Sequence, residues 1–488
     1  MSAAAPAPFR PLEAAPIAFV SFIAALAVTT AAVRAGLVPD DTLALWAGAI
    51  IAGDGGLSLG KIVAAYPTLP FLATVGLEFL APAASPVPSL IAALLAGALG
   101  AIWFVMARRA GQSGAVAACA VALLIFHPAL LRALVAGPAE MLVALALFAL
   151  GHALFDLRAR GAAPEVMLAS LMLATLTFSH SIGAALAIAS VPFLVLAVRP
   201  TLLAASPFNV VLVLIFPAVF AVLAFAYVSW VFPGSGWSFY SAPAEAAAAW
   251  TAGTKLSLSG IEPIDAGANF ALAILLGAPL AAVFAYRMRK RRPLLAPLIV
   301  LAASATVAAV LSIATGWFGD PASIIVLAPV LSALVLARAP VSAMASRELL
   351  PLLAAGWIGG AVALGFADPS LVAQLAGAKT AERERIQTLS LGHALAERDG
   401  VLVDTDNAPA VVVGRGNARG LLPPADESFA LTLMFERVDS PFVAVPNPQS
   451  ASGVNDRLNR AFPQLWREGL PGYRLVYQNS LWRLYARG

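Results

Sequence analysis

The stretch RMRKRRPLLAPLIVLAASATVAAVLSIA, residues 287–314, decides the fold class. Its last 22 residues, 293–314, contain no charged side chain. An apolar run of about 20 residues is the length that crosses a lipid bilayer as a helix. Five basic residues stand directly before this run, and cytoplasmic loops are enriched in Lys and Arg. The stretch therefore predicts a transmembrane helix that begins on the cytoplasmic side.

The composition of all 488 residues extends this interpretation to the rest of the chain. Hydrophobic residues make up 60% of the sequence, charged residues make up 11%, and the mean hydropathy is +0.87. A soluble globular protein has about 45–50% apolar and about 25% charged residues. These fractions exclude an ordinary soluble enzyme and a disordered chain. The single cysteine, Cys119, excludes a disulfide scaffold. The composition predicts a mainly α, polytopic bundle of membrane helices.

The same length criterion predicts eleven spans and one short interfacial helix. The spans are residues 16–35, 88–107, 114–131, 138–156, 165–179, 183–198, 206–231, 268–286, 293–314, 321–338 and 348–366. We interpret 165–179 and 183–198 as two helices that meet at His180, because joining them would move the RMRKRR run to the opposite side. Residues 69–82 are apolar but too short to cross, and we expect them to lie at the interface.

The distribution of basic residues predicts the orientation. With Arg10 placed inside, thirteen Lys and Arg fall in inner loops and four fall in outer loops or at outer helix ends. Residues 1–366 contain 17 basic and 13 acidic residues, so they hold the whole net charge of +4. The excess therefore indicates topology and not nucleic-acid binding. Ala-rich, Arg-over-Lys usage suggests a bacterium, and we expect an inner membrane protein with a cytoplasmic N-terminus.

Residues 367–488 have the composition of a small soluble α/β domain, which this topology places in the periplasm. They hold 13 acidic and 13 basic residues. Helical patterns are predicted at 370–398 and 454–466. Strands are predicted at 401–405, 410–414, 441–446, 473–479 and 482–487, the last two as a hairpin. The two predicted domains are thus 1–366, with a first outer loop at 37–87, and 367–488.

The outer loops hold the polar residues that are unusual in such a protein. Asp40 and Asp41 follow the first span directly. A carboxylate at the edge of the bilayer, partly removed from water, is a candidate general base. The alternative is that the pair caps a helix that begins at Thr42.

Several segments resemble the GT-C superfamily of integral membrane glycosyltransferases. The first span is followed by the Asp40–Asp41 pair, a short helix, and the YP-x-LP text of Tyr66, Pro67 and Leu69. Further similar text is HPALLRALVAGPAEMLVALALFALGHALFDLRARG (127–161), YVSWVFPGSGWSFYSAP (227–243) and VYQNSLWRLYARG (476–488). More specifically, these segments resemble bacterial members that use polyprenyl-phosphate sugars, akin to the aminoarabinose transferase and protein mannosyltransferase groups.

The resemblance implies transfer of a sugar from a polyprenyl phosphate to an acceptor hydroxyl on the periplasmic face. Asp40, or else Asp41, would be the base, and a cationic side chain would neutralise the leaving phosphate. The other candidate substrate-binding residues are Lys61, Tyr66, His127, Arg132, Glu140, His180, Trp237, Tyr240 and Lys255. Each has a structural alternative, such as snorkelling, capping or interfacial anchoring. Some members bind a divalent cation, for which Asp41, Asp54 and Glu140 are candidates.

The implied partners are the lipid-linked donor, membrane lipids and a lipid, glycan or protein acceptor, with no nucleic acid. Three alternatives remain open. They are a non-catalytic accessory subunit, a lipid or glycan transporter, and a ligase or polymerase that uses a lipid diphosphate. A transporter would have discontinuous helices and ionisable residues near mid-membrane.

Overall fold

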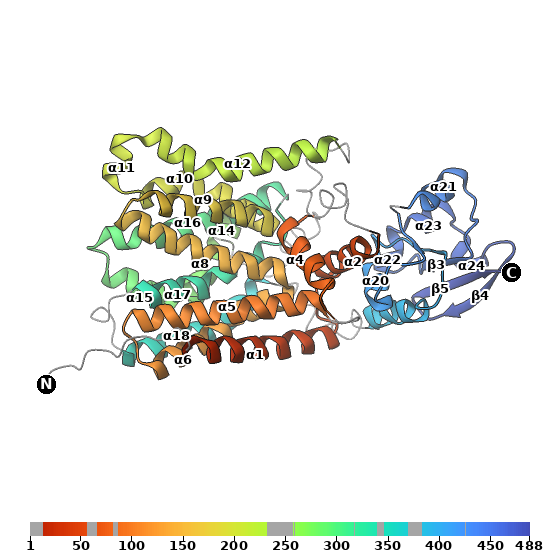
Figure 1. The fold of residues 1–488 in the computed structure, drawn as a ribbon, viewed down its shortest axis with the longest axis horizontal. Helices are drawn as coiled ribbons and strands as arrows, with labels where there is room; N and C mark the ends of the chain where they lie inside the picture. Colours follow the sequence, from red (N-terminus) through yellow and green to blue (C-terminus); the bar gives the residue numbers. More distant parts are fainter. Residues whose placement is uncertain are drawn as a thin grey trace. The chain divides into compact units, whose positions relative to one another are not determined.

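The computed structural model describes residues 13–55, 66–81, 86–231, 257, 259–316, 318–338, 346–368, 383–424 and 426–488. It is mainly helical, with a small five-stranded sheet near the C-terminus (Figure 1). Packing contacts divide the chain into two units. The membrane unit comprises 1–30, 66–70 and 89–373, and the second unit comprises 31–65, 71–88 and 374–488. The first outer loop, which the sequence analysis placed with the spans, therefore packs mostly in the second unit.

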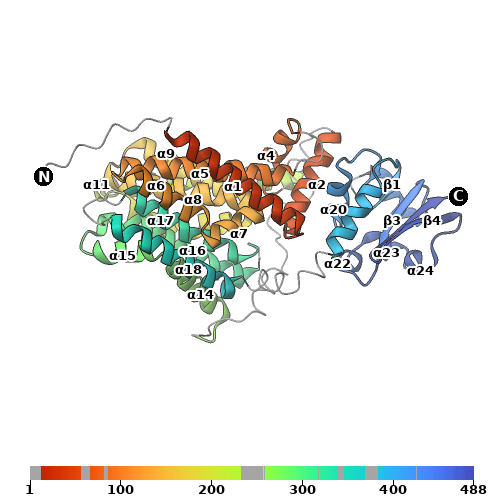
Figure 2. The ribbon, with the colours of Figure 1, turned by 90° about the horizontal axis from the view of Figure 1, so that it is seen from below.

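The membrane unit is built from helices that run side by side in both views (Figures 1 and 2). Their bounds are α1 (Ala14–Arg34), α5 (Val87–Arg109), α6 (Gly114–Ile125), α7 (Pro128–Ala136), α8 (Pro138–Ala159), α9 (Ala163–Ser179), α10 (Ser181–Ala197), α11 (Pro200–Ala205), α12 (Pro207–Val231), α14 (Glu262–Gly277), α15 (Pro279–Arg287), α16 (Arg292–Thr315), η3 (Pro321–Val326), α17 (Leu327–Arg338) and α18 (Ser346–Ala367).

The prediction of eleven spans was too high. Among the described residues, seven helices are long and apolar enough to cross a membrane, or nine if each of two bent pairs is one span. The two predicted spans that do not reach this length are α9 and α10, which have 17 residues each. At 1.5 Å per residue such a helix is about 25 Å long, short of the roughly 30 Å hydrocarbon core. Their separation at His180 is confirmed, because this residue has an extended backbone between them.

Two helix pairs are sharply bent. The break between α6 and α7 bends the chain by 57°, and the break between α14 and α15 bends it by 87°. Pro128 and Pro279 begin the second helix of each pair. Proline lacks the N–H that would continue the preceding helix, so each break leaves carbonyl groups that need other donors.

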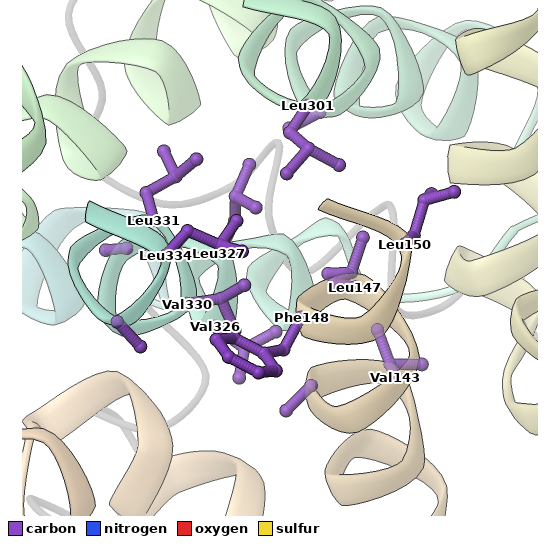
Figure 3. Packing of buried hydrophobic residues seen from close by; sticks show 14 of the residues in the cluster. Val143, Leu147, Phe148, Leu150, Leu301, Val326, Leu327, Val330, Leu331 and Leu334 are labelled. Atoms are coloured by element: carbon purple, nitrogen blue, oxygen red, sulfur yellow. The ribbon is translucent and has the colours of Figure 1, made fainter. Parts of the chain in front are cut away.

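Part of the apolar core of the membrane unit lies where α8, α16 and α17 meet (Figure 3). Leu147 and Phe148 of α8 pack there with Leu301 of α16 and Leu334 of α17. Gly151 permits the close approach, since a Cβ at this position would lie 2.4 Å from Leu334 Cδ1. This core holds the helix ends that carry the polar cluster described below.

The second unit contains α2 (Asp40–Gly55), α4 (Thr68–Glu78), α20 (Pro409–Arg415), α21 (Glu427–Phe435), α22 (Ala451–Val454), α23 (Arg457–Ala461) and α24 (Leu465–Glu468). Its strands are β1 (Val401–Leu402), β2 (Leu421–Leu422), β3 (Phe442–Pro446), β4 (Tyr473–Gln478) and β5 (Trp482–Arg487). The strand order is β2-β1-β3-β5-β4, in which β1 is parallel to β2 and β3, and β5 is antiparallel to β3 and β4.

The structure confirms the strand at 441–446 and the C-terminal hairpin, and it corrects two other predictions. Residues 410–414 were expected to form a strand but lie in the helix α20, which Pro409 begins and the left-handed Gly416 ends. The helix expected at 454–466 is instead three short helices, α22 to α24. Of the helix predicted at 370–398, residues 370–382 lie outside the described part, and residues 383–394 are helical.

The sheet buries side chains on both faces. One face carries Val401, Ala444 and Trp482, and it packs with α20 and with the apolar side of α2, including Trp46. The opposite face packs with α21, α23 and α24. Helix α2, which begins with the acidic pair, is thus part of the core of the C-terminal domain.

Candidate functional site

The most unusual feature of the membrane unit is a buried cluster around Arg132 of α7. The guanidinium Nη1 lies 2.7 Å from both carboxylate oxygens of Glu140. Nη2 donates to Asp320 Oδ2 at 2.9 Å, and Nε donates to Asp368 Oδ2 at 2.5 Å. Ser323 Oγ donates to Glu140 Oε1 at 2.7 Å. All three guanidinium nitrogens are thus hydrogen-bonded to carboxylates, one carboxylate to each nitrogen.

The ends of three elements bring the carboxylates to Arg132, which lies in the middle of α7. Glu140 lies in the first turn of α8, directly after the break at Gly137. Asp320 is the N-cap of η3, where its Oδ1 accepts the Ala322 N–H at 2.8 Å. Asp368 directly follows α18. The cluster therefore lies at one end of the helices, and the fold fixes it through caps and turns.

The charges of the cluster do not balance. With all groups ionised, three carboxylates surround one guanidinium, so the sum is −2. The side chains of Arg132, Glu140 and Asp368 are only 11%, 7% and 4% exposed, whereas that of Asp320 is 32% exposed. Ionisable groups inside a membrane protein are costly and are usually retained for function. Asp320 is therefore the most exposed carboxylate of the four-residue cluster.

The predicted residues Arg132 and Glu140 are therefore brought into contact. The sequence analysis did not select Asp320 or Asp368 as site residues. A usable signal was present, because each is a lone acid at the end of an apolar segment, and the predicted alternation of the spans puts both on the outer side with Arg132.

His127 occupies the two helix breaks. Its Nε2 lies 3.1 Å from the carbonyl oxygen of Gly277 and 3.0 Å from that of Gly356, while its Nδ1 accepts the Ala129 N–H at 3.2 Å. Because Nδ1 accepts a hydrogen bond, Nε2 carries the proton in this arrangement. His127 thus satisfies a carbonyl at the break between α14 and α15, which is a structural role.

Two other predicted residues also have specific contacts. His180 caps α10, since its Nδ1 accepts the Ile182 N–H at 3.1 Å. The neighbouring Ser181 Oγ donates to the carbonyl of Phe318 at 3.0 Å, so the start of α10 lies beside the loop that carries Asp320. Tyr66 OH donates to the carbonyl of Thr177 at 2.8 Å.

The acidic pair differs from its expected setting. Helix α2 begins at Asp40 and not at Thr42, so both acids lie in its first turn. Their negative charges interact favourably there with the positive end of the helix dipole. The Asp40 side chain is 84% exposed and pairs with Arg385 Nη2 at 3.0 Å. Asp40 is therefore not the partly dehydrated carboxylate that the sequence analysis expected. Its partner Arg385 also donates to the carbonyl of Gly36.

Four predicted residues, Lys61, Trp237, Tyr240 and Lys255, lie outside the described residues. Within the described ranges, no group of three His, Cys, Asp or Glu side chains is arranged to hold a metal ion. Of the acids considered for a cation, Glu140 binds Arg132, and Asp54 accepts the Ala418 N–H at 2.6 Å and Arg419 Nε at 3.2 Å.

Comparisons with known proteins do not identify a family for this chain. No family model, no curated protein and no solved structure matches it. A functional assignment therefore has to be argued from the side chains themselves.

A second buried carboxyl group, that of Asp456 in the C-terminal domain, should make the stability of this domain depend on pH. Its side chain is 1% exposed, and its Oδ1 accepts the Asn459 N–H at 2.7 Å. Burial raises the pKa of Asp456 to about 7, and the nearby Asp404 adds to the rise. The folded state then holds a proton that the unfolded state releases above pH 4. The free energy of unfolding should therefore fall between about pH 4 and pH 7, by on the order of 2–4 kcal/mol, and stay level above.

The variant Asp456→Asn should remove most of this pH dependence, because Asn also caps helices but does not titrate. Amide hydrogen exchange of residues 457–461, corrected for the intrinsic pH effect, measures it in the full-length protein. Asp439→Asn, a change at an exposed position of the same domain, is the control. An unchanged pH dependence in Asp456→Asn would contradict the prediction.

Proposed function

We propose that the chain is a membrane glycosyltransferase that moves a sugar from a polyprenyl-phosphate donor to an acceptor hydroxyl, with its active site at the end of the bundle that holds the Arg132 cluster. The observation that carries the proposal is the set of three carboxylates held by Arg132 at the ends of apolar helices. The resemblance of the sequence to the GT-C superfamily supports it.

Asp320 is the carboxylate that we propose as the base, with Asp40 and Asp41 as the alternatives from the first outer loop. The acceptor O–H gives its proton to the carboxylate, and the acceptor oxygen forms a bond with the anomeric carbon. The bond from that carbon to the phosphate oxygen breaks, and the phosphate leaves with the electron pair. Glu140 and Asp368 bind the same guanidinium and hold Arg132, and therefore Asp320, in place.

Arg132 does not suit the role of neutralising the leaving phosphate. Its guanidinium is bonded to three carboxylates, and the cluster around it is negative overall. A phosphate would be repelled from this position. We therefore assign the phosphate-neutralising role to Lys61 or Lys255.

The proposed orientation follows from the helix ends that lie opposite to the Arg132 cluster, because most of the basic residues are found there. Arg338 pairs there with Asp156 at 2.8 Å, and Arg160 pairs with Glu165 at 2.9 Å. Basic ends favour the cytoplasm. The Arg132 cluster would then face the periplasm of a bacterial inner membrane.

Transfer of radiolabelled sugar from polyprenyl-phosphate donors in proteoliposomes tests the proposal. Asp320→Asn should lower kcat by about 10²–10⁴-fold, the contribution of a positioned general base. Asp40→Asn and Asp41→Asn test the alternative bases, and Asp439→Asn is a control at an exposed position. Wild-type rates in Asp320→Asn with a loss in one of the other two would transfer the role of the base to that residue.

A lipid or glycan transporter is the second candidate, because the two broken helix pairs meet at His127. Discontinuous helices with buried polar groups are a feature of transporter binding sites. Movement of a labelled polyprenyl phosphate across the proteoliposome membrane, without any sugar transfer, would favour this function. If neither activity is found and all three Asn variants complement a deletion strain, the accessory-subunit alternative is favoured.

A further inference from the structure

The topology of the sheet marks one edge of the C-terminal domain. The chain runs from β1 through α20 to β2 on one side of β1, and from β2 through α21 to β3 on its other side. The segment after β1 packs on one face of the sheet, and the segment after β3 packs on the other. In open α/β sheets, ligands bind outside the carboxyl ends of two such neighbouring parallel strands.

Polar residues occupy this edge. Asp404, Asp406 and Asn407 follow β1, and Arg457 comes from the segment that follows β3. Arg457 Nη1 lies 2.7 Å from Asp406 Oδ2, and its backbone N–H donates to Asp404 Oδ2 at 3.0 Å. Asn407 Nδ2 donates to the same Asp404 oxygen at 2.8 Å. These hydrogen bonds connect the segment after β1 with the segment after β3 and hold their polar groups in place.

Beneath these groups lies a buried amide with a free acceptor. Asn459 is only 9% exposed, and its Nδ2 donates at 3.0 Å to the carbonyl of Pro446, the last residue of β3. Its Oδ1 is buried and has no hydrogen-bond partner. Asp404 and Asp456 are also buried, at 0% and 1% exposure. Buried polar atoms without partners are rare and costly, so this one calls for an explanation.

We propose that the carboxyl edge of β1 and β3 binds the sugar ring of a neutral, hydroxyl-rich ligand. Two carboxylates, those of Asp404 and Asp406, lie beside the Arg457 guanidinium, so this group of charges is negative overall and disfavours a phosphate. The Arg457 guanidinium lies between Asp404 and Asp406, where a metal ion would need to bind. A hydroxyl group both donates and accepts, so it can bond to Asp406 and Arg457 together.

The inference goes beyond the proposed reaction, because this edge is separate from the Arg132 cluster in sequence and in fold. Asp406 and Arg457 are 59% and 42% exposed, so both are open to a ligand. If the proposed function holds, the sugar bound here belongs to the acceptor.

Saturation-transfer NMR with the full-length protein in lipid nanodiscs tests the site, with glucose, mannose, galactose and arabinose as separate probes at millimolar concentration. Asp406→Ala removes one charge-assisted hydrogen bond and should weaken binding about tenfold. Asp439→Ala is the matched control. It removes an aspartate that is 61% exposed and also paired with an arginine, but precedes β3 at the opposite edge.

We expect saturation transfer to at least one sugar in the wild type and in Asp439→Ala, and much weaker transfer in Asp406→Ala. No transfer to any sugar in the wild type, or equal transfer in Asp406→Ala, would overturn the inference. The measurement needs no turnover. Sugar binding without glycosyl transfer would therefore contradict only the proposed function, and transfer without binding at this edge would contradict only this inference.

Discussion

Replacing Arg132 by Met should strongly destabilise the membrane unit. The change leaves Glu140, Asp320 and Asp368 beside one another without their shared cation, and two of these carboxylates are almost fully buried. Removing one partner of a buried ion pair costs roughly 3–5 kcal/mol. A typical protein is stable by only about 5–15 kcal/mol. We therefore expect little folded Arg132→Met protein after detergent extraction, and a much lower Tm for what remains.

The pair of Arg287 and Glu348 provides the matched control. Its N–O distance is also 2.7 Å, but the two side chains are 40% and 36% exposed. Exposed pairs contribute about 0–1 kcal/mol, so Arg287→Met should have nearly wild-type Tm and yield. Arg132→Lys should be intermediate, because a lysine keeps the charge but cannot reproduce the fork of hydrogen bonds.

A partial rescue of Tm distinguishes the effect of the lost Arg132 charge from the effect of the lost side-chain packing. Adding Glu140→Gln and Asp368→Asn to Arg132→Met removes two of the three charges, so the triple variant should recover part of the lost Tm. If Arg132→Met behaves like Arg287→Met, the cluster is not a buried ionic network and Asp320 loses its proposed support.

The membrane part of this fold could be predicted from sequence because the bilayer imposes a length on apolar segments. That criterion located the long helices α5, α8, α16 and α18 directly. It gave too many spans at α9 and α10, where the apolar run continues but His180 breaks the helix into two pieces too short to cross.

The C-terminal domain was harder to predict, since its elements are short. The run AVVVG at 410–414 is rich in β-branched residues, which favour strands, yet it forms α20. The correct signals were Pro409 and Gly416, which are typical of a helix start and end. An apolar run of this length cannot be assigned by periodicity alone.

The candidate site was predicted only in part because its members are far apart in the sequence. Arg132 and Glu140 are eight positions apart, whereas Asp320 and Asp368 are separated from Arg132 by 188 and 236 positions. The predicted topology put Asp320 on the same side as Arg132, but no local pattern shows that a single guanidinium binds all three acids. The association of α2 with the C-terminal domain had no local signal either.

The second large effect is expected in α18, where Gly359→Ala should destabilise the fold. A Cβ at Gly359 would lie 2.0 Å from the carbonyl oxygen of Leu276, a backbone atom that cannot move without shifting α14. The flanking glycines are also confined, since a Cβ at Gly356 would lie 2.8 Å from the Gly277 carbonyl oxygen, and one at Gly360 would lie 2.5 Å from His127 Cε1. These three glycines let α18 pack directly on the break between α14 and α15.

The expected cost of one added methyl group at Gly359 is about 1–3 kcal/mol for overpacking, or more if α14 has to move. Gly365→Ala is the control in the same helix, because nothing lies within 4 Å of a Cβ at that position. It should be neutral or stabilising by up to about 1 kcal/mol, the helix propensity of Ala over Gly. Thermal unfolding of both variants in the same detergent measures the difference. Equal Tm values would show that α18 does not pack closely on α14, and would remove the support that His127 gives to both helix breaks.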